Sequence, residues 1–160
     1  MPLADLLSPK AVVPSLHARC KREALASLAE RAAALTGADA DVIRESLMER
    51  ERLGSTGVGR GVAIPHGKIE GLGAMTGLLA RLDQPIDFEA VDEQPVDLIF
   101  VLLAPADASA AHLKALAKVS RLLRDERVRE ALRGAETPEA LFAIAVESEA
   151  PPLTASARAR

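Results

Sequence analysis

The sequence predicts an α/β protein, a three-layer sandwich in which a mixed central β-sheet is flanked by helices on both faces. Three observations indicate this fold. Segments with helical periodicity occur both before and after the segments with strand character. Residues 96–103 form a nearly continuous β-branched and aliphatic run, which is typical of a strand covered on both faces. The chain has 160 residues, a length that suits one domain with one core.

Two helices are expected in the first third of the chain. The first covers residues 21–35 and is followed by Gly37, a helix stop signal. Its apolar side chains recur at helical spacing: Leu25, Leu28, Ala29, Ala32 and Leu35. The second helix begins near Asp41, which we expect to cap it, and ends before Gly54.

The middle of the chain predicts a loop and then strands. Residues 54–61 contain four glycines and predict a loop with unusual backbone angles. Strands are expected over residues 62–64, 76–82 and 96–103, with a brief edge segment at residues 86–88.

Three more helices are expected in the last third. Ser109 opens a helix over residues 109–123, and a shorter helix covers residues 126–132. The longer helix carries one apolar stripe: Leu113, Leu116, Val119 and Leu123. The last helix begins at Thr137, a capping residue, with Pro138 at the first helical position.

Residues 1–146 are expected to form a single domain. After Val146 the sequence becomes small, polar and Pro-containing, with no apolar periodicity. We therefore expect residues 147–160 to be a flexible C-terminal tail.

The composition excludes several classes of function. Lys and Arg total 20 against 23 Asp and Glu, and the only aromatic residues are three Phe. Nucleic-acid binding needs a basic field and stacking aromatics, so no nucleic-acid partner is expected. No apolar run approaches the ~18 residues of a membrane span, and the N-terminus lacks a secretory signal, so we expect a cytoplasmic protein with no membrane insertion. The single cysteine, Cys20, excludes an intramolecular disulfide and is expected to be a small core residue.

His66 is the first candidate for chemistry. It follows the short strand expected at residues 62–64, with Pro65 stiffening the backbone before it and Gly67 freeing the backbone after it. A side chain at such a strand end is held on a rigid element and can project into a cleft.

The other two histidines have different surroundings. His112 occupies the N3 position of a helix capped by Ser109, where the helix dipole favours a neutral imidazole beside an anion. His17 has no polar constellation near it and is assigned no role. From the residues alone, each histidine could also be an ordinary surface or hydrogen-bonded side chain.

Basic residues flank the His66 segment: Arg44, Arg50, Arg52, Arg60 and Lys68. The helical phase of Arg50 places it beside Leu47, so we expect its side chain to point back toward the body of the domain. A guanidinium group there could neutralise and orient an anion on a histidine. The same basic residues could equally form a solvated helix face.

Neither a metal site nor a cofactor site is predicted. His66 and His112 are 46 residues apart and lack the close histidine or carboxylate partners of zinc sites. The sequence has no Gly-x-Ser-x-Gly elbow for a serine nucleophile, and its glycine spacing fits neither a dinucleotide fingerprint nor a phosphate loop.

A longer pattern surrounds His66: Glu51, six residues, Val58-Gly59, two residues, and Val62-Ala63-Ile64-Pro65-His66-Gly67. It resembles the signature of the enzyme IIA domains of the fructose/mannitol class, which belong to the bacterial phosphoenolpyruvate-dependent phosphotransferase system. The resemblance covers about residues 3–146. Residues 49–57 are most similar to the nitrogen-regulatory branch, whereas Arg60 departs from it by standing where Asn is expected between the two glycines.

The resemblance implies a site and a partner. His66 would accept a phosphoryl group from a phosphohistidine on a small carrier protein (HPr/NPr-like), on a ring nitrogen that the sequence leaves open. His112 would be the second active-site histidine and Arg50 the active-site arginine. The protein would then be a phosphotransferase-type phosphoryl carrier rather than a small-molecule enzyme.

Three functions remain open at this point. The first is a phosphocarrier whose phosphorylation state regulates partner proteins, such as potassium transport or sensor kinase components. The second is a sugar-specific component that passes phosphate to a separate fructose- or mannitol-type permease subunit. The third is a regulatory binding module without phosphotransfer. The lack of Trp and Tyr favours a phosphoryl group over a sugar as the group bound, since sugars commonly stack on those rings.

Overall fold

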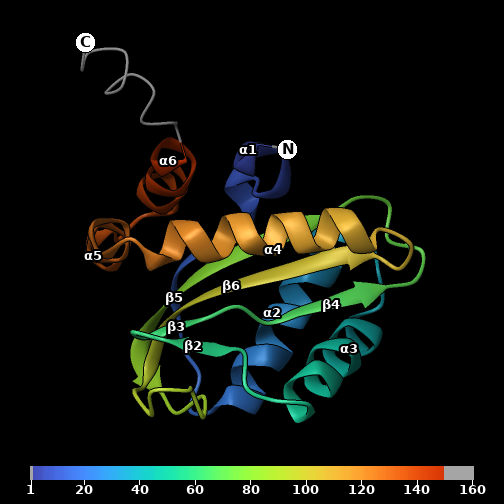
Figure 1. Ribbon diagram of the computed structural model, residues 1–160, viewed down its shortest axis with the longest axis horizontal. Coiled ribbons are helices and arrows are strands. Elements are labelled where there is room, and N and C mark those ends of the chain that lie inside the picture. Colours follow the sequence, from blue (N-terminus) through green and yellow to red (C-terminus); the bar gives the residue numbers. More distant parts are fainter. Residues whose placement is uncertain (1, 150–160) are drawn as a thin grey trace.

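A six-stranded mixed sheet forms the centre of the computed structural model, which describes residues 2–149. The strand order is β1-β5-β6-β3-β2, and β4 also pairs with β6. Figure 1 shows α4 crossing one face of this sheet, while α2 and α3 lie on the opposite side. The predicted three-layer α/β fold is therefore confirmed.

The described residues contain these elements. The helices are α1 (Leu3–Leu6), the 3-10 turn η1 (Pro9–Ala11), α2 (Lys21–Thr36), α3 (Ala40–Arg52), α4 (Ser109–Arg124), α5 (Glu126–Gly134) and α6 (Pro138–Ser148). The strands are β1 (Val12–Leu16), β2 (Gly57–Gly59), β3 (Val62–Ala63), β4 (His66–Ile69), β5 (Thr76–Ile86) and β6 (Val96–Pro105).

Strand β6 is the centre of the core. It pairs antiparallel with β5 on one side and parallel with β3 and β4 on the other. Its residues 98–104 are fully buried, as the continuous apolar run predicted. Burial on both faces accounts for this run, because neither face of the strand meets water.

Strands β3 and β4 lie end to end along the same side of β6. Strand β3 pairs with Leu98 and Ile99, and β4 pairs with β6 from Leu102 onward. Pro65 lies in the break between them, where its missing N–H leaves no regular ladder bond, although its carbonyl accepts the N–H of Leu102 at 2.9 Å. His66 therefore follows the end of β3, as predicted, and also begins β4, a strand that was not predicted.

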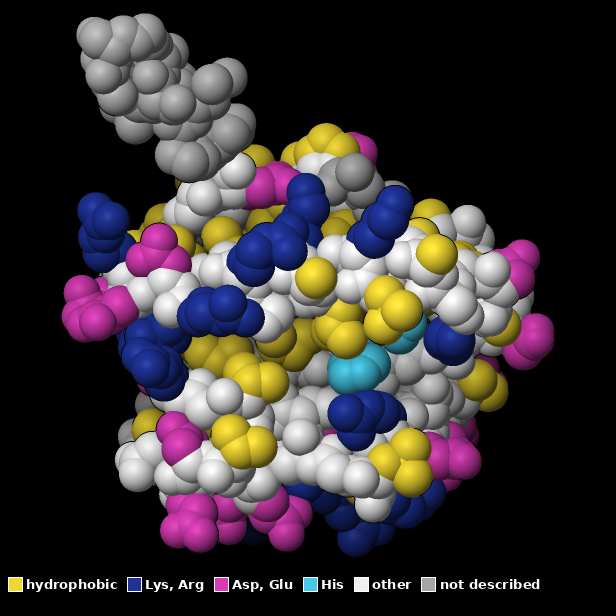
Figure 2. All heavy atoms as spheres, viewed as in Figure 1, with side chains coloured by type: hydrophobic (Ala, Val, Ile, Leu, Met, Phe, Trp, Pro, Cys, Tyr) yellow, Lys and Arg dark blue, Asp and Glu magenta, His cyan; other side chains and the backbone are white. Residues whose placement is uncertain are grey.

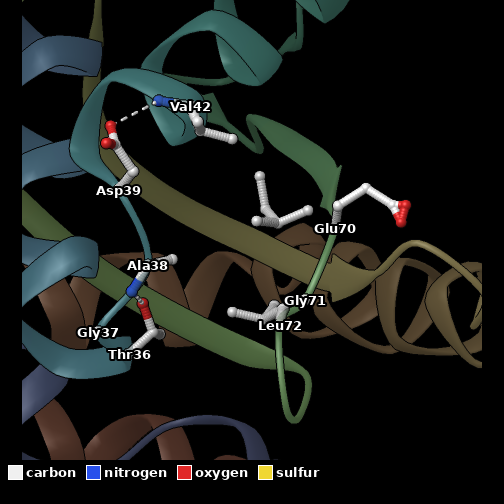
Figure 3. A pocket seen from close by; sticks show the side chains of 9 residues that line it. Thr36, Gly37, Ala38, Asp39, Val42, Glu70, Gly71 and Leu72 are labelled. Carbon is white, nitrogen blue, oxygen red and sulfur yellow. Dashed lines mark hydrogen bonds between the residues drawn. The ribbon is translucent and has the colours of Figure 1, made fainter.

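Two helix caps differ from the prediction, and one agrees. Helix α3 is capped by Asp39, not Asp41, and Figure 3 shows the Asp39 carboxylate accepting the N–H of Val42. The residue that precedes α4 is Ala108 rather than Ser109, so His112 occupies the N4 position instead of N3. Thr137 caps α6 as predicted, with its hydroxyl accepting the N–H of Ala140 and Pro at the first position.

Several short elements were not predicted. Helix α1 and strand β1 precede the first predicted helix, and β2 lies within the segment predicted as a glycine loop. The predicted edge segment at residues 86–88 is instead the end of β5 followed by a buried Phe88. The prediction that Cys20 is a small core residue was wrong. Cys20 is exposed, because it lies just before α2 and outside the apolar stripe of that helix.

The C-terminal boundary lies later than predicted. Helix α6 continues through Ser148, two residues beyond Val146. The Glu149 carboxylate then accepts the N–H of Leu3 at 2.6 Å and the ammonium group of Lys118. The rest of the predicted tail, residues 150–160, lies outside the described residues. Over residues 2–149, every helix is too short or too polar to cross a bilayer.

Candidate functional site

His66 and His112 lie against each other although they are far apart in the sequence. His66 comes from the start of β4 and His112 from the N-terminal part of α4. Their ring centroids are 5.5 Å apart and the rings meet edge to face at 75°. Figure 2 shows the two histidine side chains side by side on one face of the molecule, with hydrophobic and basic side chains around them.

Arg50 completes the group from α3. Its Nε donates a hydrogen bond to Nε2 of His66 at 3.2 Å, and its Nη1 donates to the carbonyl of Gly54 at 2.8 Å. Arg50 lies in the last turn of α3, where the helix dipole favours a cation. The predicted direction of this side chain, back toward the body of the domain, is confirmed.

Hydrogen bonds fix the tautomer of His66. Its Nδ1 lies 2.8 Å from the carbonyl oxygen of Ile64, and a carbonyl oxygen can only accept, so Nδ1 carries the proton. Nε2 then holds the free electron pair, which agrees with its role as the acceptor from Arg50. The arrangement presents Nε2 as the nucleophilic nitrogen of this ring.

The surroundings of both histidines favour the neutral imidazole. Burial is the main cause that lowers the pKa of His66, and the Arg50 guanidinium lowers it further, against opposing effects from the Ile64 carbonyl and Glu51. Burial also lowers the pKa of His112, with smaller contributions from His66 and Lys68. A neutral imidazole has one nitrogen with a free electron pair, which can act as a nucleophile, and one N–H group, which can donate a hydrogen bond.

His112 has an unsatisfied nitrogen. The residue is only 7% exposed, and its Nε2 is the one buried side-chain nitrogen or oxygen without a hydrogen-bond partner among residues 2–149. Its own backbone N–H is already bonded to the carbonyl of Ala108 at 2.9 Å. A buried polar atom without a partner is costly, so an anion bound beside His66 would satisfy it.

A buried carboxylate fixes the end of α3 that carries Arg50. Glu51 accepts the N–H and the hydroxyl of Thr56, and it pairs with Lys21 of α2 at 3.1 Å. Lys21 also pairs with Glu89 at 2.8 Å. These bonds connect α2, the end of α3 and the loop that contains Gly54, so they hold the carbonyl that orients Arg50.

Gly67 is needed for close packing. A Cβ atom at this position would overlap the hydroxyl oxygen of Ser46 on α3. The glycine therefore lets α3 approach β4 closely enough for Arg50 to reach His66. Its role is space for a neighbouring helix rather than the backbone freedom that the sequence suggested.

The three site residues line an open depression of about 460 Å³. Its rim is apolar: Leu53 is 83% exposed and Leu113 is 69% exposed. Lys68 lies beside it and donates to the hydroxyl of Ser109 at 2.6 Å. No role was predicted for Leu53, although an apolar side chain in a polar, charged segment can indicate an exposed contact surface.

The other basic residues do not converge on the histidines. Arg44 pairs with Asp41 at 3.0 Å, and Arg52 lies 3.9 Å from Glu45. Arg60 lies on the turn between β2 and β3. His17 is hydrogen-bonded to an exposed Asp83 at 3.3 Å and does not line the depression.

The arrangement can accept and orient an anionic group on a histidine. It offers a nucleophilic nitrogen, a guanidinium group bonded to that nitrogen, and an unsatisfied imidazole nitrogen. No group of three or more His, Cys, Asp or Glu that could hold a metal occurs within residues 2–149. A phosphoryl group suits this chemistry, since it accepts several charge-assisted hydrogen bonds.

Comparison with known protein families identifies the class. The family described as "Phosphoenolpyruvate-dependent sugar phosphotransferase system, EIIA 2" matches residues 5–147. The chain therefore belongs to this family, as the signature around His66 indicated.

The relatives narrow the class to a branch. A nitrogen regulatory protein of Bradyrhizobium diazoefficiens is 50% identical over 156 residues, which cover 98% of this chain and all of that protein. The nitrogen regulatory protein of Escherichia coli K12 is 40% identical over 152 residues, 94% of this chain and 93% of that protein. The crystal structure of nitrogen regulatory protein IIA-Ntr from Neisseria meningitidis matches with a TM-score of 0.85 and 33% identity, covering 89% of this chain and 98% of that one. The chain is thus similar to the nitrogen-regulatory branch of the family.

Proposed function

We propose that the protein is a cytoplasmic phosphocarrier that accepts a phosphoryl group on Nε2 of His66 from an HPr/NPr-like phosphohistidine carrier. Its phosphorylation state then decides which partner proteins it binds. The observation that carries this proposal is the contact between Arg50 Nε and His66 Nε2, beside the unsatisfied Nε2 of His112.

The reaction exchanges one phosphorus–nitrogen bond for another. The free electron pair of His66 Nε2 attacks phosphorus in line, and the bond to the donor's imidazole breaks. The leaving imidazole keeps the electron pair of that bond and takes up one proton from water. His66 retains its Nδ1 proton on the Ile64 carbonyl, so its ring carries a positive charge next to the dianionic phosphoryl group. Because the two bonds are similar, the protein's task is positioning and charge neutralisation.

Arg50 and His112 would share the charge of the phosphoryl group. Once Nε2 of His66 is bonded to phosphorus, the Arg50 Nε–H loses its acceptor and can donate to a phosphoryl oxygen instead. Neutral His112 with its proton on Nε2 would donate to a second oxygen and so gain its missing partner. These donors are in place before the reaction, which is what preorganised charge stabilisation requires.

The surroundings of the site suit a protein partner. The depression is open, and Leu53 and Leu113 expose apolar surface next to the histidines. Phosphorylation would add roughly −1.5 to −2 charge at the centre of this apolar rim. A partner that buries the rim would therefore distinguish the two states, which supports a regulatory role like the one that the relatives' names state.

Phosphorylation by purified general phosphotransferase components tests the proposal. Labelled phosphoenolpyruvate should transfer label to the wild-type chain and to His17→Ala, but not to His66→Ala. The bond should be acid-labile, as expected for a phosphohistidine. Label in His66→Ala would remove this residue from the proposal, and a wild-type chain without label would favour the binding-module function.

The sugar-specific alternative has its own readout. Membrane extracts that contain fructose- or mannitol-type permease subunits would be mixed with phosphorylated protein. We expect the label to stay on protein. Transfer of label to a sugar would show that this chain acts in sugar transport, and it would contradict the proposed regulatory function.

A further inference from the structure

A second cavity, of about 320 Å³, lies under the C-terminal half of α4 and faces the β2–β3 turn. Three arginines from three elements line it: Arg60 from the turn, Arg124 from α4 and Arg129 from α5, with Ser120 beside them. None of the described residues that line it is acidic. Figure 2 shows Lys and Arg side chains beside a hydrophobic-floored hollow to the left of the histidines.

Arg129 is buried without a carboxylate partner. It is only 4% exposed, and its Nη1 donates to the carbonyls of Leu123 at 3.0 Å and Arg124 at 2.7 Å. These bonds cap the end of α4 but use only part of the guanidinium. Its Nε and Nη2 make no hydrogen bond within residues 2–149 and keep some contact with solvent. A charged side chain this deeply buried is almost always paired.

Two acidic residues close to the β2–β3 turn are hydrogen-bonded or ion-paired. Asp92 accepts the backbone N–H of Arg60 at 2.8 Å and that of Gln94 at 3.1 Å. Asp97 pairs with Arg133 at 3.0 Å. Asp92 lies close enough for its charge to act on Arg60, but none of the three lining arginines forms an ion pair within residues 2–149. The lining itself therefore holds three positive charges and no negative one, in a chain whose net charge is −3.

The backbone gives no reason for an arginine at position 60. Arg60 and Gly61 form the two-residue turn between β2 and β3, with φ of 60° and 80°. Asn-Gly suits such a turn because Asn tolerates positive φ, whereas Arg is disfavoured there. The arginine side chain nevertheless lines the cavity, and residues in such disfavoured conformations cluster at ligand sites.

We propose that this cavity binds the phosphate or diphosphate group of a small phosphorylated ligand. Guanidinium groups match phosphate oxygens with paired N–H donors, and Ser120 adds a hydroxyl donor. The combined charge of three arginines matches a multiply charged phosphate better than it matches a ligand with a single carboxylate. The volume lies within the range of small-ligand pockets. No residue lines both this cavity and the depression around His66, so the site is separate from the phosphoryl acceptor.

Titration of the full chain with inorganic phosphate and inorganic pyrophosphate tests the proposal, by calorimetry and by amide chemical shifts. The wild type should bind at least one of the two ions, with the largest shifts at the residues that line the cavity. Arg60→Asn and Arg124→Gln should each weaken binding about tenfold or more, because each removes a charge-assisted contact. Arg60→Asn should unfold at a temperature no lower than the wild type, since Asn suits the turn.

A control variant makes the result specific. Arg121→Gln removes an exposed charge from the same helix without touching the cavity, and it should bind the ions as the wild type does. The inference is overturned if neither ion shifts the amides that line the cavity at millimolar concentration, if Arg60→Asn with Arg124→Gln leaves those shifts unchanged, or if Arg121→Gln abolishes them. The outcome of this titration does not depend on whether His66 accepts a phosphoryl group.

Discussion

Arg50 donates its Nε hydrogen to Nε2 of His66, while the Nδ1 hydrogen of the same ring is bonded to the carbonyl of Ile64. The two ring nitrogens are therefore distinguished by their partners. One holds the proton, and the other presents its electron pair to a guanidinium group that can later bind the phosphoryl oxygens.

Arg50→Gln should slow phosphoryl transfer to His66 about a hundredfold, because it removes a preorganised donor to the developing charge. The substitution should also raise the pKa of His66, since the nearby guanidinium lowers it. Transfer rates and an NMR titration of the imidazole measure the two effects. Arg52→Gln, an exposed change on the same helix, is the matched control. Equal rates for both variants would remove Arg50 from the mechanism.

His112→Ala should leave the fold stable and slow transfer roughly tenfold, because it removes one hydrogen-bond donor to a charged group. Nε2 of His112 has no partner in the structure, so its loss breaks no described hydrogen bond. His112→Gln, whose amide can donate from a similar position, should recover part of the rate. If His112→Gln is as slow as His112→Ala, the imidazole acts through packing rather than through Nε2.

The free energy of unfolding should fall as the pH drops below about 6.5, the ordinary pKa of histidine in an unfolded chain. Burial lowers the pKa of both His66 and His112 in the folded protein. Below pH 6.5 the unfolded chain therefore binds more protons than the folded one, and the loss continues until the pH passes the folded pKa values. Urea unfolding at pH 7 and pH 5 measures the effect. The double variant His66→Gln/His112→Gln should show a smaller pH dependence, and an unchanged slope would contradict this account.

Gly67→Ala should destabilise the protein by about 1 kcal/mol and slow transfer, because the added Cβ overlaps the Ser46 hydroxyl, which must rotate away, and then packs tightly against the Ser46 Cβ. Ser46→Ala removes that hydroxyl oxygen, so the double variant should regain most of the stability and rate. Denaturant unfolding and transfer assays on both variants measure the recovery. A double variant no better than Gly67→Ala alone would show that the strain lies elsewhere.

The main elements could be predicted because their patterns are long and regular. The run at residues 96–103 and the stripe of α2 each repeat one period over many residues. Strand β1 has only five residues and contains Pro14, so the local sequence does not predict that it pairs with β5. The cap of α3 is one of two aspartates, Asp39 and Asp41, and only the phase of the helix decides between them.

The site residues could be predicted from the signature, but their supporting contacts could not. The bond from His66 to Ile64 depends on the break between β3 and β4. The contact of Lys21 with Glu51 joins residues 30 positions apart, and no local pattern predicts it. The cavity under α4 combines residues from three elements, so it becomes visible only in the folded chain.

The interruption at Pro65 also has a chemical consequence. Because the ladder is broken there, the carbonyl of Ile64 is available to hold the Nδ1 proton of His66. Within the proposed reaction, the backbone thus selects one regioisomer of phosphohistidine. The phosphorylated protein should then decay with a single lifetime, as one chemical species rather than a mixture of two.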